Sequence, residues 1–142
     1  MQKHIFLATI AALLFGVSLL SLTGCSTNRN PLAGTDWKLT GWTLNSLNPA
    51  DFTITAKFSD QNISGISAIN SYSGPYKLGA NGAITVGQLA GTLMAGPEPA
   101  MRAESAYLTL LGQANSYRLV DNKLILYDPN GNESLIFEPP DK

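Results

Sequence analysis

The only cysteine of the chain, Cys25, stands in a setting that predicts covalent attachment of lipid. A short polar start precedes a nearly continuous apolar run over residues 5–20, which is the layout of a secretory signal. The small residues Thr23 and Gly24 come directly before the cysteine, as in a lipobox. We therefore expect a signal peptide over residues 1–24 and a diacylglycerol on the Cys25 thiol, with the lipobox formed by Leu22, Thr23, Gly24 and Cys25. The alternative is an uncleaved membrane anchor, but the apolar run is short for a membrane span.

Removal of the leader and lipidation together limit the chemistry of the mature chain. The only histidine, His4, leaves with the leader, and the lipid consumes the only thiol. This excludes Ser-His-Asp and Cys-His nucleophilic sites, and zinc sites built from histidine or thiolate. A phosphate-binding glycine loop with its lysine does not occur in the sequence. Chemistry from carboxylates alone, from a Ser-Lys pair or from an oxygen-ligated cation stays open.

Glu104, flanked by small residues in a predicted helix, is the candidate general acid. A glycosidase-type mechanism would need a second carboxylate within about 5 to 10 Å, from Asp51, Asp60 or Asp128. Carboxylates that bond to loop amides or face solvent are more frequent, so we interpret Glu104 as structural. The oxygen-rich run at 128–133 is interpreted as a hairpin turn, because it lacks the spacing of a calcium loop. We predict no catalytic residue, no metal and no cofactor.

Four aromatic residues offer a second kind of site. They could line a binding groove, although aromatic residues in the strands of a small domain more often belong to its core. These residues are Trp37, Trp42, Tyr72 and Tyr76. Nucleic acid is not expected as a ligand: the chain has 9 Lys and Arg against 10 Asp and Glu, and the leader carries one of the cations, Lys3.

Alternating apolar and polar residues predict antiparallel strands at 36–42, 52–58, 62–70, 74–78, 83–86, 117–120, 124–127 and 134–137. Gly65 suggests a bulge or bend within its strand. Asn81 and Gly82 predict a hairpin turn, because both residues tolerate positive φ. Further turns are expected at Asp121-Asn122 and at 128–131.

One segment has helical periodicity, and we place a helix at 99–111. Met101, Glu104, Leu108 and Leu111 stand near helical spacing, and Tyr107 and Leu110 widen this stripe. The predicted fold is α+β: a curved antiparallel sheet or incomplete barrel with a single helix packed on it, after the lipoprotein signal peptide.

The expected domain organisation is a signal peptide at 1–24, a lipidated tether at 25–31 and one globular domain at 32–138. Acyl chains on Cys25 would hold this domain at a membrane of the cell envelope. In a Gram-negative host, Ser26 in place of aspartate after the cysteine favours transport to the outer membrane, with the domain facing the periplasm. The expected partners are the membrane itself and another envelope protein or glycan.

Several stretches together resemble the META domain, the HslJ-like family, over nearly all of the mature chain. They are Leu32–Leu39, Gly65–Tyr76, Thr92–Ala95, Glu104 and Leu124–Gly131. The family motif positions, interpreted as structural, are Asn70, Tyr72, Gly74, Tyr76, Thr92, Met94 and Glu104. The resemblance implies a non-enzymatic role related to stress or secretion, because the family has no established catalysis. A carboxylate-based enzyme acting on envelope glycans and an inhibitor of an extracellular hydrolase are the alternatives.

The sequence departs from this family at two positions. Ile69 and Gly96 stand where related sequences usually carry a cysteine each. The paired loss suggests that the family's cysteines meet, as an oxidising compartment permits. We therefore expect the two residues to be neighbours, with Cα atoms within about 7 Å and Ile69 buried.

Overall fold

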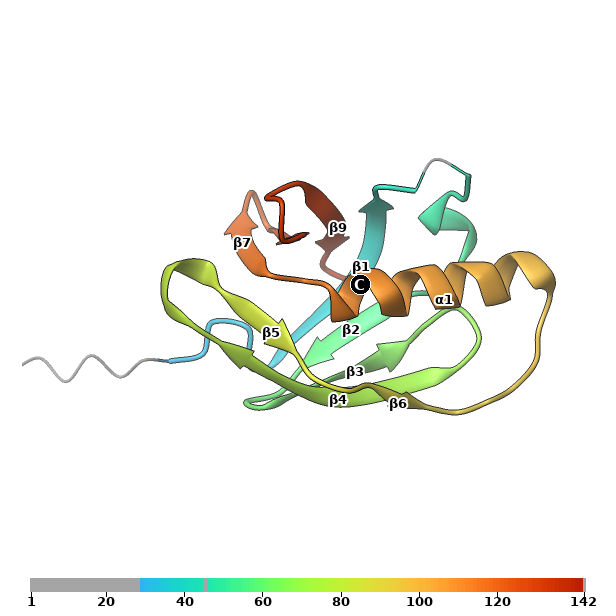
Figure 1. Cartoon of the computed structure of the whole chain (residues 1–142), viewed down its shortest axis with the longest axis horizontal. Coiled ribbons are helices and arrows are strands. Elements are labelled where there is room, and N and C mark those ends of the chain that lie inside the picture. The colour runs from blue at the N-terminus through green and yellow to red at the C-terminus, as the bar shows by residue number, and fades with distance from the viewer. Residues whose placement is uncertain (1–28, 45, 142) are drawn as a thin grey trace, which may run out of the picture.

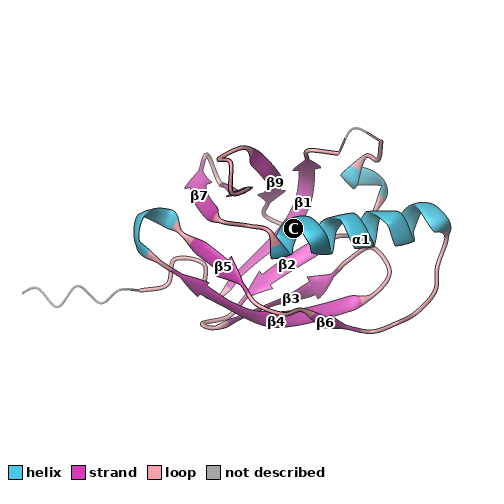
Figure 2. Ribbon diagram, in the orientation of Figure 1, coloured by secondary structure: helices cyan, strands magenta, loops and turns pink. Residues whose placement is uncertain are grey.

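The structure, a computed structural model, describes residues 29–44 and 46–141 (Figure 1). The predicted signal peptide, the lipobox and Cys25 lie outside these residues. Within them, one antiparallel sheet and one α-helix make up the domain (Figure 2). The strands are β1 (Thr35–Trp42), β2 (Thr55–Phe58), β3 (Asn62–Ile66), β4 (Ser71–Leu78), β5 (Ile84–Val86), β6 (Ala90–Gly91), β7 (Ser116–Val120), β8 (Lys123–Tyr127) and β9 (Glu133–Glu138).

The strand order is β5-β4-β3-β2-β1-β9-β8-β7, with β6 paired to the first part of β4. The sheet curves so far that Ala83, the residue before edge strand β5, forms an isolated bridge with Ser116 of the other edge strand, β7. Beside it, the Ile84 N–H donates to the Asn115 carbonyl at 3.1 Å. The sheet is not closed beyond this point, and the helix packs on it. The predicted α+β fold, a curved sheet with one helix, is therefore confirmed.

The helix α1 (Glu98–Gly112) lies within a residue of the prediction at both ends. Its buried face is formed by Ala103, Tyr107 and Leu111. The predicted stripe was wrong in part, since Met101 is 48% exposed and Leu108 is only half-buried. The reason is size: alanine at 103 lets the helix approach the sheet closely, whereas the stripe was chosen from large apolar side chains.

Two strands are shorter than predicted. The segment 52–58 forms strand only from Thr55, after a 3-10 turn, η1 (Pro49–Asp51). The segment 62–70 leaves the sheet after Ile66, because the Ser67 N–H bonds to the Asn70 carbonyl and closes a turn. The short strand β6 was not predicted at all.

Gly65 was expected to mark a bulge or bend, and the structure shows no bulge there. The pairing of β3 with β4 keeps its register through Gly65 and Ile66. The glycine is required for a different reason: a Cβ atom at this position would overlap the carbonyl oxygen of Thr55. The backbone of β2 therefore approaches β3 at a place where a side chain would prevent it.

The predicted turns are confirmed by their backbone angles. Asn81 and Gly82 have φ of 58° and 75°, and Asp121 and Asn122 have φ of 50° and 60°. Asp128 accepts hydrogen bonds from the backbone N–H groups of Asn130 and Asn132 at 2.8 and 2.9 Å, which fixes the turn between β8 and β9.

Three of the four aromatic candidates lie in the core. Trp37, Tyr72 and Tyr76 are buried, while Trp42 is half-buried and donates from its indole N–H to the Leu47 carbonyl at 2.8 Å. The core lies between the curved sheet and α1. Its largest fully buried side chains include Tyr107, Phe58 and Phe137.

Candidate functional site

The carboxylate of Glu104 lies at the centre of a polar cluster that joins α1 to two loops. Its Oε2 accepts from the Ser67 hydroxyl at 2.7 Å and from the Asn70 backbone N–H at 2.9 Å. Its Oε1 accepts from the side-chain amide of Asn70 at 2.9 Å. The helix is thus fixed to the turn at 67–70 that ends β3. We call the cluster of Ser67, Asn70, Thr92 and Glu104 the polar bracket.

Asn70 is the central residue of the polar bracket, and its amide is fully used. Its Nδ2 group donates one hydrogen bond to Glu104 and one to the Met94 carbonyl, the latter at 3.1 Å. The Oδ1 atom accepts from the Thr92 hydroxyl and from the Met94 N–H, both at 2.7 Å. Two donors and two acceptors exhaust what an asparagine amide can offer. Asn70 therefore fixes the loop before α1 to the same turn that holds the helix.

The hydrogen bonds set the charge state of Glu104. Burial raises its pKa, but donation from the Asn70 side chain, from the Ser67 hydroxyl and from the backbone N–H groups of Asn70 and Ile69 outweighs burial. The net pKa lies below the ordinary value. Glu104 is thus held as an anion, whereas a general acid at neutral pH needs a raised pKa.

The turn that carries Asn70 contains a residue in an unfavourable conformation. Ala68 has φ of 85°, a region that residues with a Cβ atom seldom occupy. Its N–H bonds to the Thr53 carbonyl at 3.0 Å, which holds the turn against the chain before β2. Backbone strain of this kind persists only where the surrounding structure enforces it. Here the bonds of Ser67, Ala68 and Asn70 enforce it.

Ile69 and Gly96 are in direct contact, as the hypothesis of paired cysteine positions requires. A Cβ atom built on Gly96 would lie 2.5 Å from Cδ1 of Ile69. The expectation that Ile69 is buried was wrong, because the residue is only half-buried. It lies at the surface of the junction between the turn and the loop.

The motif positions Tyr72, Gly74 and Tyr76 lie on β4 and have separate surroundings. Tyr72 donates to the Thr55 carbonyl at 2.9 Å and lies 2.6 Å from the hydroxyl of Tyr107 on the helix. Burial raises the pKa of both phenols. A Cβ atom on Gly74 would come within 2.7 Å of the Gln88 carbonyl oxygen, so the strand leaves room for the chain that crosses it. Tyr76 lies at the other end of β4.

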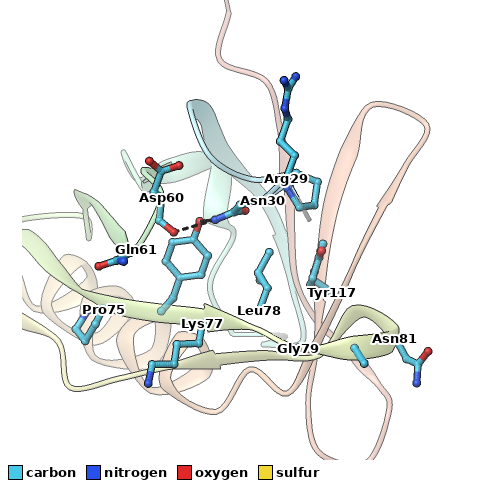
Figure 3. Close-up of a pocket in the computed structure, with 13 residues that line it drawn as sticks. Arg29, Asn30, Asp60, Gln61, Pro75, Lys77, Leu78, Gly79, Asn81 and Tyr117 are labelled. Carbon is cyan, nitrogen blue, oxygen red and sulfur yellow. Dashed lines mark hydrogen bonds between the residues drawn. The ribbon is translucent and has the colours of Figure 1, made fainter. Parts of the chain in front are cut away.

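An open groove of about 830 Å³ lies around Tyr76, where the chain enters the domain (Figure 3). The Tyr76 hydroxyl donates to the Ser59 carbonyl at 2.7 Å and accepts from the Asn30 amide at 2.6 Å. In Figure 3 the charged ends of Arg29, Asp60 and Lys77 point away from the centre of the groove. The groups that could act on a charged ligand therefore do not converge there.

The carboxylates considered as partners of Glu104 belong to other parts of the fold. Asp51 is exposed in η1, Asp60 is exposed after β2, and Asp128 bonds to its own turn. The groups that face Glu104 are Ser67 and Asn70. Within residues 29–44 and 46–141, no three His, Cys, Asp or Glu side chains gather where they could hold a metal ion. The same part of the chain contains no helix long and apolar enough to cross a membrane.

The motif residues Asn70, Thr92, Met94 and Glu104 form one hydrogen-bonded cluster. The sequence model of the META domain matches residues 30–141. The chain belongs to the META domain family. No curated protein matches the chain in sequence.

Solved structures share the fold of this chain. An NMR structure of a protein from Burkholderia xenovorans is 28% identical, with a TM-score of 0.64, and each chain covers 100% of the other. A crystal structure of a DUF4847 family protein from Bacteroides vulgatus is 12% identical, with a TM-score of 0.57 over 79% of this chain and 96% of that one. At that identity the second likeness shows the fold alone.

Sequence reasoning missed Ser67 as part of the site, and it did not single out the exposed Leu93 in the adjoining loop. Ser67 lay inside a predicted strand, and nothing in its neighbours indicates that its side chain turns toward the helix. Leu93 is 99% exposed in the META domain, although it lies between the motif residues Thr92 and Met94. The available signal was an apolar residue between Thr92 and Met94, outside any periodic segment.

Proposed function

We propose that this chain is a lipid-anchored protein of the cell envelope whose META domain binds another envelope component and catalyses no reaction. The anchoring rests on the apolar leader and the lipobox that ends at Cys25. A role in envelope stress is consistent with the family. In a Gram-negative host, Ser26 after the cysteine favours the outer membrane, with the domain in the periplasm.

The observation that carries the binding role is the use of Glu104. Both oxygens of its carboxylate accept hydrogen bonds that hold the turn at 67–70. Through Asn70 these bonds also hold the loop at 92–94. A helix, a strained turn and an exposed loop are thereby held in one geometry. Such pre-organisation favours binding, because little conformational entropy remains to be lost on association.

Hydrogen bonds also fix the start of the domain, which supports anchoring at that end. The Asn30 amide donates to the Asp60 carbonyl at 3.0 Å and to the Tyr76 hydroxyl, and its Oδ1 accepts from the Leu32 N–H at 2.9 Å. Five residue steps separate Cys25 from Asn30 in the sequence. They can span at most about 18 Å, so a lipid on Cys25 would keep this end of the domain near the membrane.

Metabolic labelling with palmitate tests the anchor. The full chain should incorporate label and fractionate with membranes, and Cys25→Ala should do neither and accumulate as precursor. Ser26→Ala is the matched control, because it changes the neighbouring residue and leaves the lipobox intact. Equal labelling of the wild type and Cys25→Ala would refute the proposal.

A further inference from the structure

Three apolar side chains are exposed where the loop before α1 meets the helix. Leu93 is 99% exposed, Met94 59% and Met101 48%. Met101 and Glu104 are three residues apart on the helix and share a face, and Glu104 bonds Asn70, which bonds Met94. Met101 therefore lies on the side of the helix that adjoins the loop. We call Leu93, Met94 and Met101 the apolar tip.

The backbone under the apolar tip is fixed. Both the N–H and the carbonyl of Met94 bond to the amide of Asn70, a residue that is itself buried. The Thr92 N–H bonds to the Ser71 carbonyl at 3.0 Å, and the backbone of Gly96 lies against the side chain of Ile69. The loop is thus held from three sides while Leu93 points into solvent. An exposed leucine on a fixed loop is a pre-formed contact.

The loop that carries Leu93 and Met94 is uncharged, and the two charges that border Met101 on the helix are paired with each other. The sequence from Val86 to Pro97 contains no charged residue. The nearest charges along the chain, Glu98 and Arg102, pair with each other at 3.7 Å. The surface therefore attracts neither anionic lipid nor a charged peptide by electrostatics. Its chemistry suits an apolar pocket, and methionine side chains adapt to the shape of such a pocket.

The apolar tip lies far from the point at which the chain enters the domain. Along the long axis in Figure 1, the blue segment that begins at residue 29 is at the left end, and the loop leading into α1 is at the right end. The orientation of the domain rests on the proposed function, in which a lipid on Cys25 holds the end with residue 29 at the membrane. The apolar tip then points away from that membrane, toward the compartment in which a protein partner would be found.

We infer that the apolar tip is a docking surface that inserts into an uncharged, apolar pocket of another envelope protein. A second copy of this chain is a poorer occupant, because its groove around Tyr76 is lined in part by Arg29, Asp60 and Lys77 and is therefore not an uncharged pocket. In a larger protein interface, a few apolar side chains that insert into a desolvated pocket can contribute most of the binding free energy.

Site-specific photo-crosslinking in intact cells of the native host tests this inference. A benzophenone amino acid replaces Ala95, an exposed residue beside Met94, in the full lipidated chain. We expect a discrete adduct with one protein. The same probe at Leu119, an exposed apolar residue that lies with Pro31 near the start of the domain, should not yield this adduct.

The adduct must also depend on the apolar side chains. Leu93→Ser should reduce its yield by about 30-fold, and Leu93→Met should retain it, while both variants melt like the wild type because Leu93 makes no buried contact. Val120→Ser, which removes an exposed apolar residue elsewhere, is the matched control and should leave the yield unchanged.

Three results would overturn the inference: an adduct with lipid, an adduct of twice the mass of the chain, or a yield that Leu93→Ser does not alter. Palmitate labelling of the same cells separates this failure from failure of the proposed function. A labelled protein whose Ala95 probe gives no protein adduct refutes the docking surface alone. An unlabelled protein refutes the anchoring, and with it the membrane-distal position of the apolar tip.

Discussion

The side chain of Ile69 occupies the space that a Cβ atom on Gly96 would need, with Cδ1 at 2.5 Å and Cγ1 at 3.0 Å from that position. The isoleucine thus fills the junction between the turn at 67–70 and the loop before α1, and the glycine makes this possible. The two residues are complementary in size. Position 96 should therefore accept a larger residue only when the side chain at position 69 is smaller.

Gly96→Ala should destabilise the domain by about 1 to 3 kcal/mol, because the new methyl group overlaps Ile69. Ile69→Ala alone should cost about 1 to 2 kcal/mol, less than a fully buried isoleucine would. In the Ile69→Ala background, Gly96→Ala should cost almost nothing. Urea unfolding of the four proteins measures this coupling, and additive effects would show that a methyl group at 96 and the Ile69 side chain do not compete for the same space.

The same junction should accept a disulfide. With Ile69→Cys and Gly96→Cys combined, mild oxidation should form a bridge, since the side-chain positions of the two residues meet. Closing the loop between them should stabilise the domain by about 3 kcal/mol relative to the reduced form. The reduced form of the same variant is the control for the lost isoleucine. Free thiols that persist after oxidation would contradict the geometry.

The polar bracket should make stability depend on pH through Glu104. The pKa of this carboxyl is lowered in the folded state from an ordinary value of 4.5. Its contribution to stability is therefore complete above about pH 4.5 and is lost as pH falls through the lowered pKa. Glu104→Gln should cost about 1 to 3 kcal/mol at neutral pH, because a glutamine NH₂ would face a donor of Ser67 or Asn70.

Urea unfolding at about pH 7 and about pH 3 tests this dependence. The difference between the wild type and Glu104→Gln should shrink at the lower pH. Glu98→Gln is the matched control on the same helix, because Glu98 is exposed and pairs only with Arg102 at the surface. A difference that stays constant with pH would show that the charge of Glu104 does not contribute.

The tyrosine pair between β4 and the helix should respond asymmetrically to loss of a hydroxyl. Tyr72 donates its only proton to the Thr55 carbonyl, so Tyr107 must donate to Tyr72. Tyr107→Phe leaves the Tyr72 bond intact and should cost under about 1 kcal/mol. Tyr72→Phe leaves the fully buried Tyr107 hydroxyl without its partner and should cost about 1 to 3 kcal/mol. Equal losses in thermal unfolding would contradict this direction of donation.

The sequence predicts those parts of this fold that depend on local periodicity and turn chemistry. Alternation placed β1, β7, β8 and β9 within a residue or two, and the positive φ angles at Asn81 and Asp121 follow from residue type. The start of β3 at Asn62 was also predicted, but its end at Ile66 was not. Residues 67–70 alternate like a strand, but bonds to a helix more than thirty residues away in the chain draw them out of the sheet.

The candidate site was predicted only as a set of residues. Asn70, Thr92, Met94 and Glu104 were singled out by resemblance to the META domain, but their spacing does not reveal that one asparagine amide joins them all. The helix face was misassigned for a related reason. Which side of a helix is buried depends on the neighbour it meets, and the small residue Ala103 faces the sheet where Met101 was expected.

The strained turn offers a final prediction, because Ala68 adopts φ of 85° beside the polar bracket. Ala68→Gly should relieve a conformational cost of about 1 to 2 kcal/mol, offset in part by the greater freedom of glycine in the unfolded chain. The net result should be a gain of up to about 1 kcal/mol in the free energy of unfolding. Ala83→Gly is the matched control, since Ala83 has φ of −67° and should lose about 0.5 to 1 kcal/mol. If both variants lose stability equally in urea unfolding, the turn at 67–70 is not strained, and Asn70 holds its position without backbone cost.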